Sequence, residues 1–108
     1  MDPVTVAVLA LLSGPTPWTT FRIGNGSSGQ CTVAVPEVCL EVNRFDDPHS
    51  VHVRYPGRPG HVIATLTGTV GKDIWDRAAA RAAADEAAAA AADTDEAARA
   101  AFLRQFGR

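Results

Sequence analysis

Five short apolar runs occupy the middle of the chain, and Gly, Pro, Asn or Asp separates each run from the next. The runs are rich in Val, Ile, Thr and aromatic residues, which favour β-strands. Connections this short leave no room for crossover helices, so we expect an antiparallel meander of four or five strands. The predicted strands are residues 18–23, 31–35, 38–42, 51–55 and 61–67.

The apolar segment 3–12 admits two interpretations. Asp2 as a helix N-cap, Pro3 in the first turn and Gly14 just past the end favour a short helix. The β-branched residues at its start favour a strand instead. We expect the helix. The segment is far shorter than the roughly 20 residues that span a bilayer, and it lacks the basic start and A-x-A cleavage pattern of a signal peptide.

After Gly71 the pattern changes to a segment made largely of alanine, the residue with the highest helix propensity. We expect a helix over about 72–92. Asp93 is typical of an N-cap, and Glu96 follows it at the third helical position, so we expect a break near 93 and a second helix over about 94–106.

The whole pattern predicts an α+β protein: a small antiparallel meander with a short N-terminal helix and a long Ala-rich C-terminal helical tail. We expect a compact β-rich domain over 1–71 and the tail over 72–108. The chain has 108 residues, 46% of them hydrophobic, and a net charge of -2 with both signs spread along its length. This composition shows no basic footprint for nucleic acid or for a membrane surface, so we expect neither partner. The expected location is cytoplasmic or virion-associated.

The Ala-rich helix has two different faces on a helical wheel. One face carries charged residues at i, i+4 spacing, which predicts a solvated stripe. The opposite face offers mainly methyl groups, which hold weakly but allow another backbone to approach closely. This face can lie on the chain's own sheet with Trp75 as anchor, pack against a neighbouring subunit, or stay solvated. The stripe is Asp73, Arg77, Arg81 and Asp85, and the opposite face is Trp75, Ala78, Ala79, Ala82, Ala83, Ala89 and Ala90.

The end of the tail concentrates large apolar residues within about one helical turn. Such a group, if exposed, makes a patch of the kind that marks an interaction site. We therefore expect the tail to bind another protein surface, either a second copy or a distinct partner. The residues predicted to bind a partner are Trp75, Ala79, Ala82, Phe102, Leu103 and Phe106.

Whether the two cysteines can form a disulfide depends on the register of the central hairpin. A two-residue turn at Pro36 and Glu37 would place Cys31 opposite Val42 and segregate the valines onto one face. The two cysteines, Cys31 and Cys39, then lie on opposite faces, where no disulfide can join them. We expect two free thiols and a reducing compartment.

The sequence contains only weak candidates for a catalytic, nucleotide-binding or metal-binding site. The stretch "GNGSSG" (24–29) matches the dinucleotide fingerprint letter for letter, but a strand rather than a helix is expected to follow it, so we interpret it as a hairpin connection. His49, His52 and His61 show no paired ligand spacing of the zinc-site type. We expect no cofactor, no metal, no small-molecule substrate and no enzymatic activity.

Trp18, the Gly/Ser-rich stretch that ends at Cys31, the "VHVR" of 51–54 and Trp75 together resemble the small actinobacterial proteins related to the BldB developmental regulator. The likeness covers about half the chain, and the alanine segment has no counterpart in it. The resemblance implies a small regulatory partner protein of a bacterial transcriptional regulator. The primary hypothesis is a non-enzymatic interaction or structural subunit, because a compact sheet with a helical tail that ends in large apolar residues suits attachment better than chemistry. We expect the assembly to be bacterial or from a bacteriophage, because high Ala and Arg usage is typical of GC-rich genomes.

Overall fold

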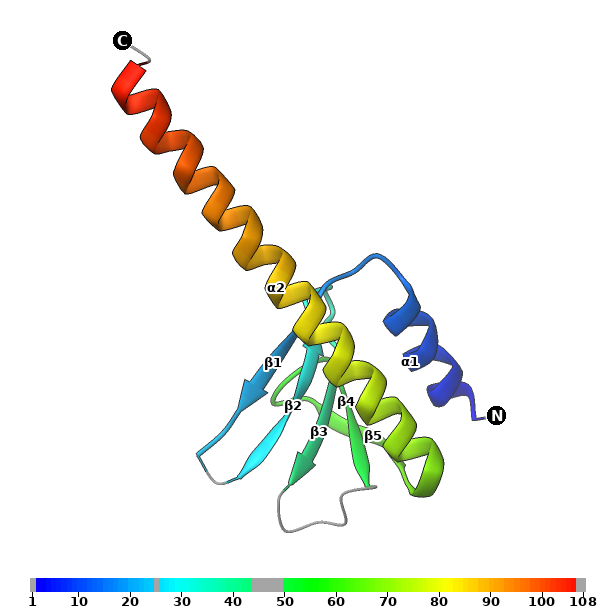
Figure 1. The fold of residues 1–108 in the computed structure, drawn as a ribbon. Coiled ribbons are helices and arrows are strands. Elements are labelled where there is room, and N and C mark those ends of the chain that lie inside the picture. The colour runs from blue at the N-terminus through cyan, green and yellow to red at the C-terminus, as the bar shows by residue number, and fades with distance from the viewer. Residues whose placement is uncertain (1, 25, 44–49, 107–108) are drawn as a thin grey trace.

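The computed structural model describes residues 2–24, 26–43 and 50–106. It shows the predicted α+β fold, with two helices and five antiparallel strands in one sheet of order β1-β2-β3-β4-β5 (Figure 1). The elements are α1 (Pro3–Ser13), β1 (Trp18–Arg22), β2 (Ser27–Thr32), β3 (Cys39–Asn43), β4 (Val51–Tyr55), β5 (His61–Leu66) and α2 (Gly68–Phe106).

The apolar N-terminal segment is a helix, as expected. Pro3 occupies the first turn, where its missing N–H costs nothing, and the backbone N–H of Gly14 donates to the carbonyl of Leu11 at the other end. Of the strands, β4 matches its predicted bounds, and β1, β3 and β5 fall within a residue of theirs at each end.

The core lies between one face of the sheet and the two helices. The sheet contributes Leu40, Val51 and Val53, all fully buried. Both helices pack against the same cluster, so a single core serves the whole body of the protein. The other members of this cluster are Trp18 on β1, Leu66 on β5, and Val8, Leu12, Ile74, Ala78 and Ala82 on the two helices.

The predicted strand at 31–35 is wrong, and so is the register of the central hairpin. The strand β2 begins earlier, at Ser27, and ends at Thr32. Thr32 closes the turn, because its hydroxyl accepts from the N–H of Val38 at 3.1 Å while its own N–H donates to the carbonyl of Val38 at 2.9 Å. The alternating valines that suggested a strand lie in this turn, and Val35 is 96% exposed.

The corrected register also overturns the expectation of free thiols. Cys31 pairs directly with Cys39 across β2 and β3, with their Cα atoms 4.1 Å apart, and the two form a disulfide. The register differs from the predicted one by three residues. An odd shift exchanges the faces of one strand relative to the other, so cysteines expected on opposite faces meet on one. The argument for a reducing compartment loses its basis.

The predicted break near Asp93 is absent, since α2 is one continuous helix from Gly68 to Phe106. The reason is local. The hydroxyl of Thr94 donates to the carbonyl of Ala90 at 3.0 Å, so it bonds within the helix instead of capping a new one. Alanines on both sides then carry the helix through the polar residues.

Candidate functional site

The helix α2 divides into two parts with different surroundings. Its first part crosses the sheet, and Ile74, Ala78 and Ala82 are buried against it. From residue 86 to residue 105 every residue is exposed, and in Figure 1 this part runs on past the sheet as an isolated helix. We call residues 86–106 the outer half of α2.

Three of the predicted partner-binding residues belong to the chain's own body instead. Ala82 is fully buried in the core, and Trp75 and Ala79 are half-buried, with Trp75 packed against the core cluster. The alanine methyl groups let α2 approach the chain's own sheet closely. The sequence had suggested the same close approach for the backbone of a partner. Ala82 is therefore unavailable to a partner in this structure.

The end of the tail keeps its apolar character in the structure. Phe102 is 60% exposed and Leu103 is 54% exposed on the outer half of α2. Phe106 ends the helix, and its side chain lies outside the described residues. Two large apolar side chains that are neighbours in the sequence thus stay exposed near the end of α2, far from Trp75.

The direction of α2 is fixed by a cluster of polar contacts around Arg81. Its guanidinium donates to the carbonyls of Leu12 and Gly14, each at 2.7 Å, and to that of Thr16 at 2.9 Å. It also donates to Asp85 at 2.8 Å. These bonds tie α2 to the end of α1 and to the segment that joins α1 to β1. We call this arrangement the Arg81 clamp.

Asp85 connects the same cluster to the sheet. Its carboxylate accepts from the backbone N–H of Trp18 at 2.8 Å, and Glu86 accepts from the N–H of Thr20. Since β1 is an edge strand, these two carboxylates cover N–H groups that an added strand would otherwise engage. The hydrogen bond from Trp18, aided by Arg81, holds the pKa of Asp85 below its ordinary value.

The predicted solvated stripe is therefore correct for only half of its residues. Arg77 and Asp73 form an ion pair at 2.9 Å in which the side chains are 60% and 58% exposed. Arg81 and Asp85 form the next pair along the helix, but each side chain is only 22% exposed. The loop between α1 and β1 covers this second pair, and nothing in the helical spacing marks the difference.

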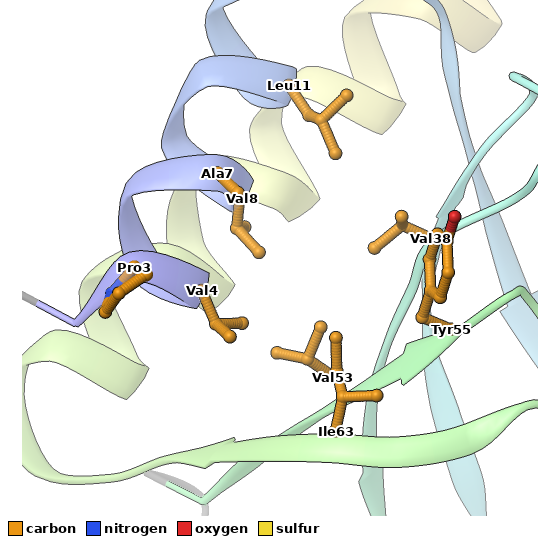
Figure 2. A pocket seen from close by; sticks show the side chains of 9 residues that line it. All are labelled: Pro3, Val4, Ala7, Val8, Leu11, Val38, Val53, Tyr55 and Ile63. Atoms are coloured by element: carbon orange, nitrogen blue, oxygen red, sulfur yellow. The ribbon is translucent and has the colours of Figure 1, made fainter.

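An apolar cavity of about 380 Å³ lies between α1 and the sheet (Figure 2). From α1, Val4, Val8 and Leu11 point toward the sheet, and Val53 and Ile63 face them from the other side. The remaining lining residues are Pro3, Ala7, Val38 and Tyr55, so the Tyr55 hydroxyl is the sole polar side-chain group in the lining. No sequence pattern singled out this cavity, because it depends on where α1 docks.

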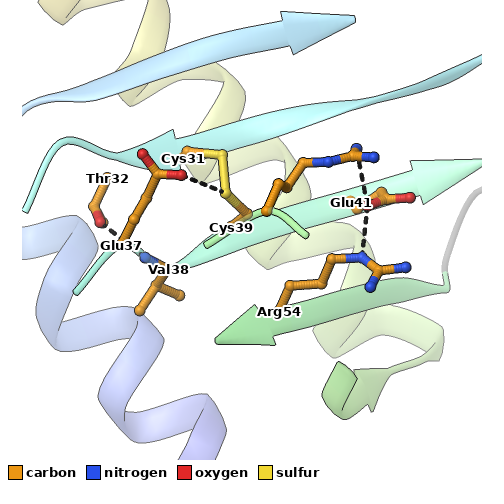
Figure 3. The surroundings of a disulfide bond; sticks show 8 residues. Cys31, Thr32, Glu37, Val38, Cys39, Glu41 and Arg54 are labelled. Atoms are coloured by element: carbon orange, nitrogen blue, oxygen red, sulfur yellow. Dashed lines mark hydrogen bonds and ion pairs between the residues drawn. A yellow bond between two sulfur atoms is a disulfide. The ribbon is translucent and has the colours of Figure 1, made fainter. Parts of the chain in front are cut away.

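The other face of the sheet carries the disulfide and a polar cluster (Figure 3). Glu41 is buried and pairs with Arg54 at 2.7 Å and with Arg58 at 3.0 Å. The guanidinium of Arg58 also lies 4.8 Å from the centre of the Phe21 ring. Because Glu41 is satisfied by two cations, this cluster serves to hold the β4–β5 turn against the sheet.

Among the described residues, one group has the spacing of metal ligands, namely Cys31, Glu37 and Cys39. The two sulfur atoms are already bonded to each other, and Glu37 Oε1 lies 3.4 Å from Cys39 Sγ. A sulfur in a disulfide carries no proton to donate and is a poor ligand for a cation. Of the three histidines, His52 forms a hydrogen bond with Thr65, His61 is exposed at the start of β5, and His49 lies outside the described residues.

The stretch 24–29 is partly the hairpin connection that we expected. Gly26 closes the turn by donating to the carbonyl of Ile23, and β2 starts at Ser27. Gly29 lies within the strand, where a Cβ atom would sit 1.8 Å from the carbonyl oxygen of Leu40. This close approach of backbones, rather than phosphate binding, accounts for that glycine.

Comparison of the chain with known protein families, curated proteins and solved structures found no match in any of the three. The resemblance to BldB-related proteins therefore rests on the residues quoted for it alone. Within the described residues, no helix is long and apolar enough to cross a membrane.

Proposed function

We propose that the protein is a non-enzymatic interaction or assembly subunit that attaches to another protein through the outer half of α2. One observation carries this proposal. A helix that packs on the body for its first part continues over residues 86–105 with every residue exposed, and it ends in exposed Phe102 and Leu103.

Burial of Phe102 and Leu103 alone does not supply enough free energy for a stable complex. Fully burying a Phe or Leu side chain stabilises by about 1.5–3 kcal/mol, and both residues are already partly covered, so together they contribute roughly 2–4 kcal/mol. Association costs about 4–15 kcal/mol in lost freedom. Further contacts, along the alanine surface or through several copies, must supply the rest. Repeated copies in a bacterial or bacteriophage assembly meet this requirement.

The test compares two double variants by light scattering and thermal unfolding. We expect Phe102→Ala with Leu103→Ala to abolish association while the melting temperature of the body stays within a degree or two of the wild type. The matched control, Asp95→Ala with Glu96→Ala, changes two exposed residues of the outer half of α2 that lie away from Phe102 and Leu103, and it should associate normally. Unchanged association of the first variant would refute the proposal.

The regulatory partner implied by the BldB-like resemblance makes a different prediction. Such a protein would be a lone monomer that forms a complex with a distinct protein only. A purified chain that stays monomeric at all concentrations would favour this second function.

A further inference from the structure

The apolar cavity between α1 and the sheet has the size and chemistry of a binding site. Its volume of about 380 Å³ lies within the range of roughly 300–1,000 Å³ that is usual for ligand sites. An apolar cavity of about 150 Å³ already accepts a benzene molecule, so this one has ample room for an aromatic side chain.

The lining restricts what can enter. Apart from the hydroxyl of Tyr55, the side chains offer carbon only, so a charged or hydrogen-bonding group would lose its hydration without compensation. The rim is also apolar, because Tyr55 and Ile63 remain substantially exposed there. The site therefore selects an apolar occupant that has a second apolar group close beside the first.

The chain itself carries such a pair of apolar groups, Phe102 and Leu103, on the outer half of α2. We infer that the cavity receives the end of α2 from a second copy of this chain, with Phe102 in the cavity and Leu103 against the rim at Tyr55 and Ile63. This inference deepens the proposed function and rests on it, since it names the surface to which the tail attaches.

A chain cannot fill its own cavity in this way. The Arg81 clamp fixes the first part of α2 on the sheet, and the helix runs straight on, away from α1 (Figure 1). At about 1.5 Å per residue, the stretch from Glu86 to Phe106 ends roughly 30 Å past the body. The occupant must come from another molecule.

Charge at the two surfaces is complementary. Arg99 and Arg104 flank Phe102 and Leu103 on the tail, whereas Asp2 stands next to Pro3 at the cavity. Such pairing at the edge of a contact guides the approach of the two surfaces. A contact between two different patches of identical chains is heterologous, so it either closes into a ring or reciprocal pair, or continues as a filament.

The experiment uses two full-length variants that cannot assemble alone, one because its cavity is filled and the other because its tail lacks the apolar side chains. Ala7 lines the cavity and is exposed, so Ala7→Phe fills the cavity without disturbing the core. The tail variant, Phe102→Ala with Leu103→Ala, leaves the cavity open. We expect each variant alone to be monomeric where the wild type assembles. Mixed in equal amounts they should form a one-to-one pair, because one supplies the tail and the other supplies the cavity.

The controls separate the possible failures. Ala10→Phe places the same ring on the exposed surface of α1, outside the cavity lining, and should assemble as the wild type does. If Ala7→Phe is unfolded by circular dichroism, Ile63→Lys at the exposed rim takes its place in the mixture. Normal assembly of the cavity variant, or a mixture that stays monomeric, overturns this inference while the proposed function stands. Normal assembly of the tail variant overturns both.

Discussion

Replacing Arg81 by alanine tests whether the clamp holds α2 on the body. The guanidinium donates to three backbone carbonyls, one in the last turn of α1 and two in the segment between α1 and β1, and the side chain is only 22% exposed. Truncation leaves these acceptors without a protein partner. The matched control is Arg77→Ala, one turn earlier on the same helix, whose ion pair is more than half exposed.

The contacts set the size of the effect. A hydrogen bond contributes about 0.5–1.5 kcal/mol net, more when the donor is charged, so three bonds from a guanidinium are worth roughly 2–4 kcal/mol. Part of this is regained when water reaches the carbonyls. The exposed pair of Arg77 is worth at most about 0.5 kcal/mol. We therefore expect Arg81→Ala to lower the free energy of unfolding by about 2–4 kcal/mol and Arg77→Ala by less than about 0.5 kcal/mol.

Urea unfolding followed by tryptophan fluorescence measures this difference, because Trp18 is fully buried beside the clamp. Circular dichroism of the same samples reports the helix separately. If Arg81→Ala unfolds at the same urea concentration as Arg77→Ala, the clamp does not stabilise the fold and the fixed direction of α2 loses its support.

Three further predictions concern Asp85, the disulfide and the glycines. Folding lowers the pKa of Asp85 from 3.8, so the ionised carboxylate stabilises the fold above that pH, and this stabilisation is lost as the pH falls through the lower folded-state value. Asp85→Asn should therefore reduce the drop in melting temperature that the wild type shows on acidification. Thiol titration of the denatured, unreduced protein should find no free thiol, and Cys31→Ala with Cys39→Ala should cost about 2–3 kcal/mol of unfolding free energy for a cross-link of sequence separation 8. Gly29→Ala should destabilise by several kcal/mol, since its Cβ would overlap a backbone carbonyl, whereas Gly24→Ala, with nothing within 4 Å, should be nearly neutral in the same urea assay.

The meander was predictable from sequence because strand-forming apolar runs and turn-forming residues mark it independently of each other. The run Val51–Tyr55 alternates between buried and partly exposed residues and ends at a Pro-Gly turn, and the structure has it unchanged. The central hairpin gave a false signal. Val33 and Val35 alternate as a strand does, but the turn between Thr32 and Val38 is held by hydrogen bonds that no spacing reveals.

The candidate site was only partly predictable for a related reason. The helical wheel placed Ala78 and Ala82 on the apolar face of α2, and both are buried. Methyl groups do not show whether the chain's own sheet or a partner covers that face, and Ala82 was assigned to a partner. Ile74 offered the missing signal, because it lies four and eight residues before the buried Ala78 and Ala82. The burial of Arg81 and the cavity beside α1 depend on where a distant helix docks, which no local pattern encodes.

The mass of the wild-type protein in solution tests the central claim most directly. Sedimentation equilibrium from micromolar to millimolar concentration should show a mass that rises with concentration from 11.3 kDa toward multiples of that value. A mass that stays at the monomer value over the whole range would contradict assembly through the outer half of α2.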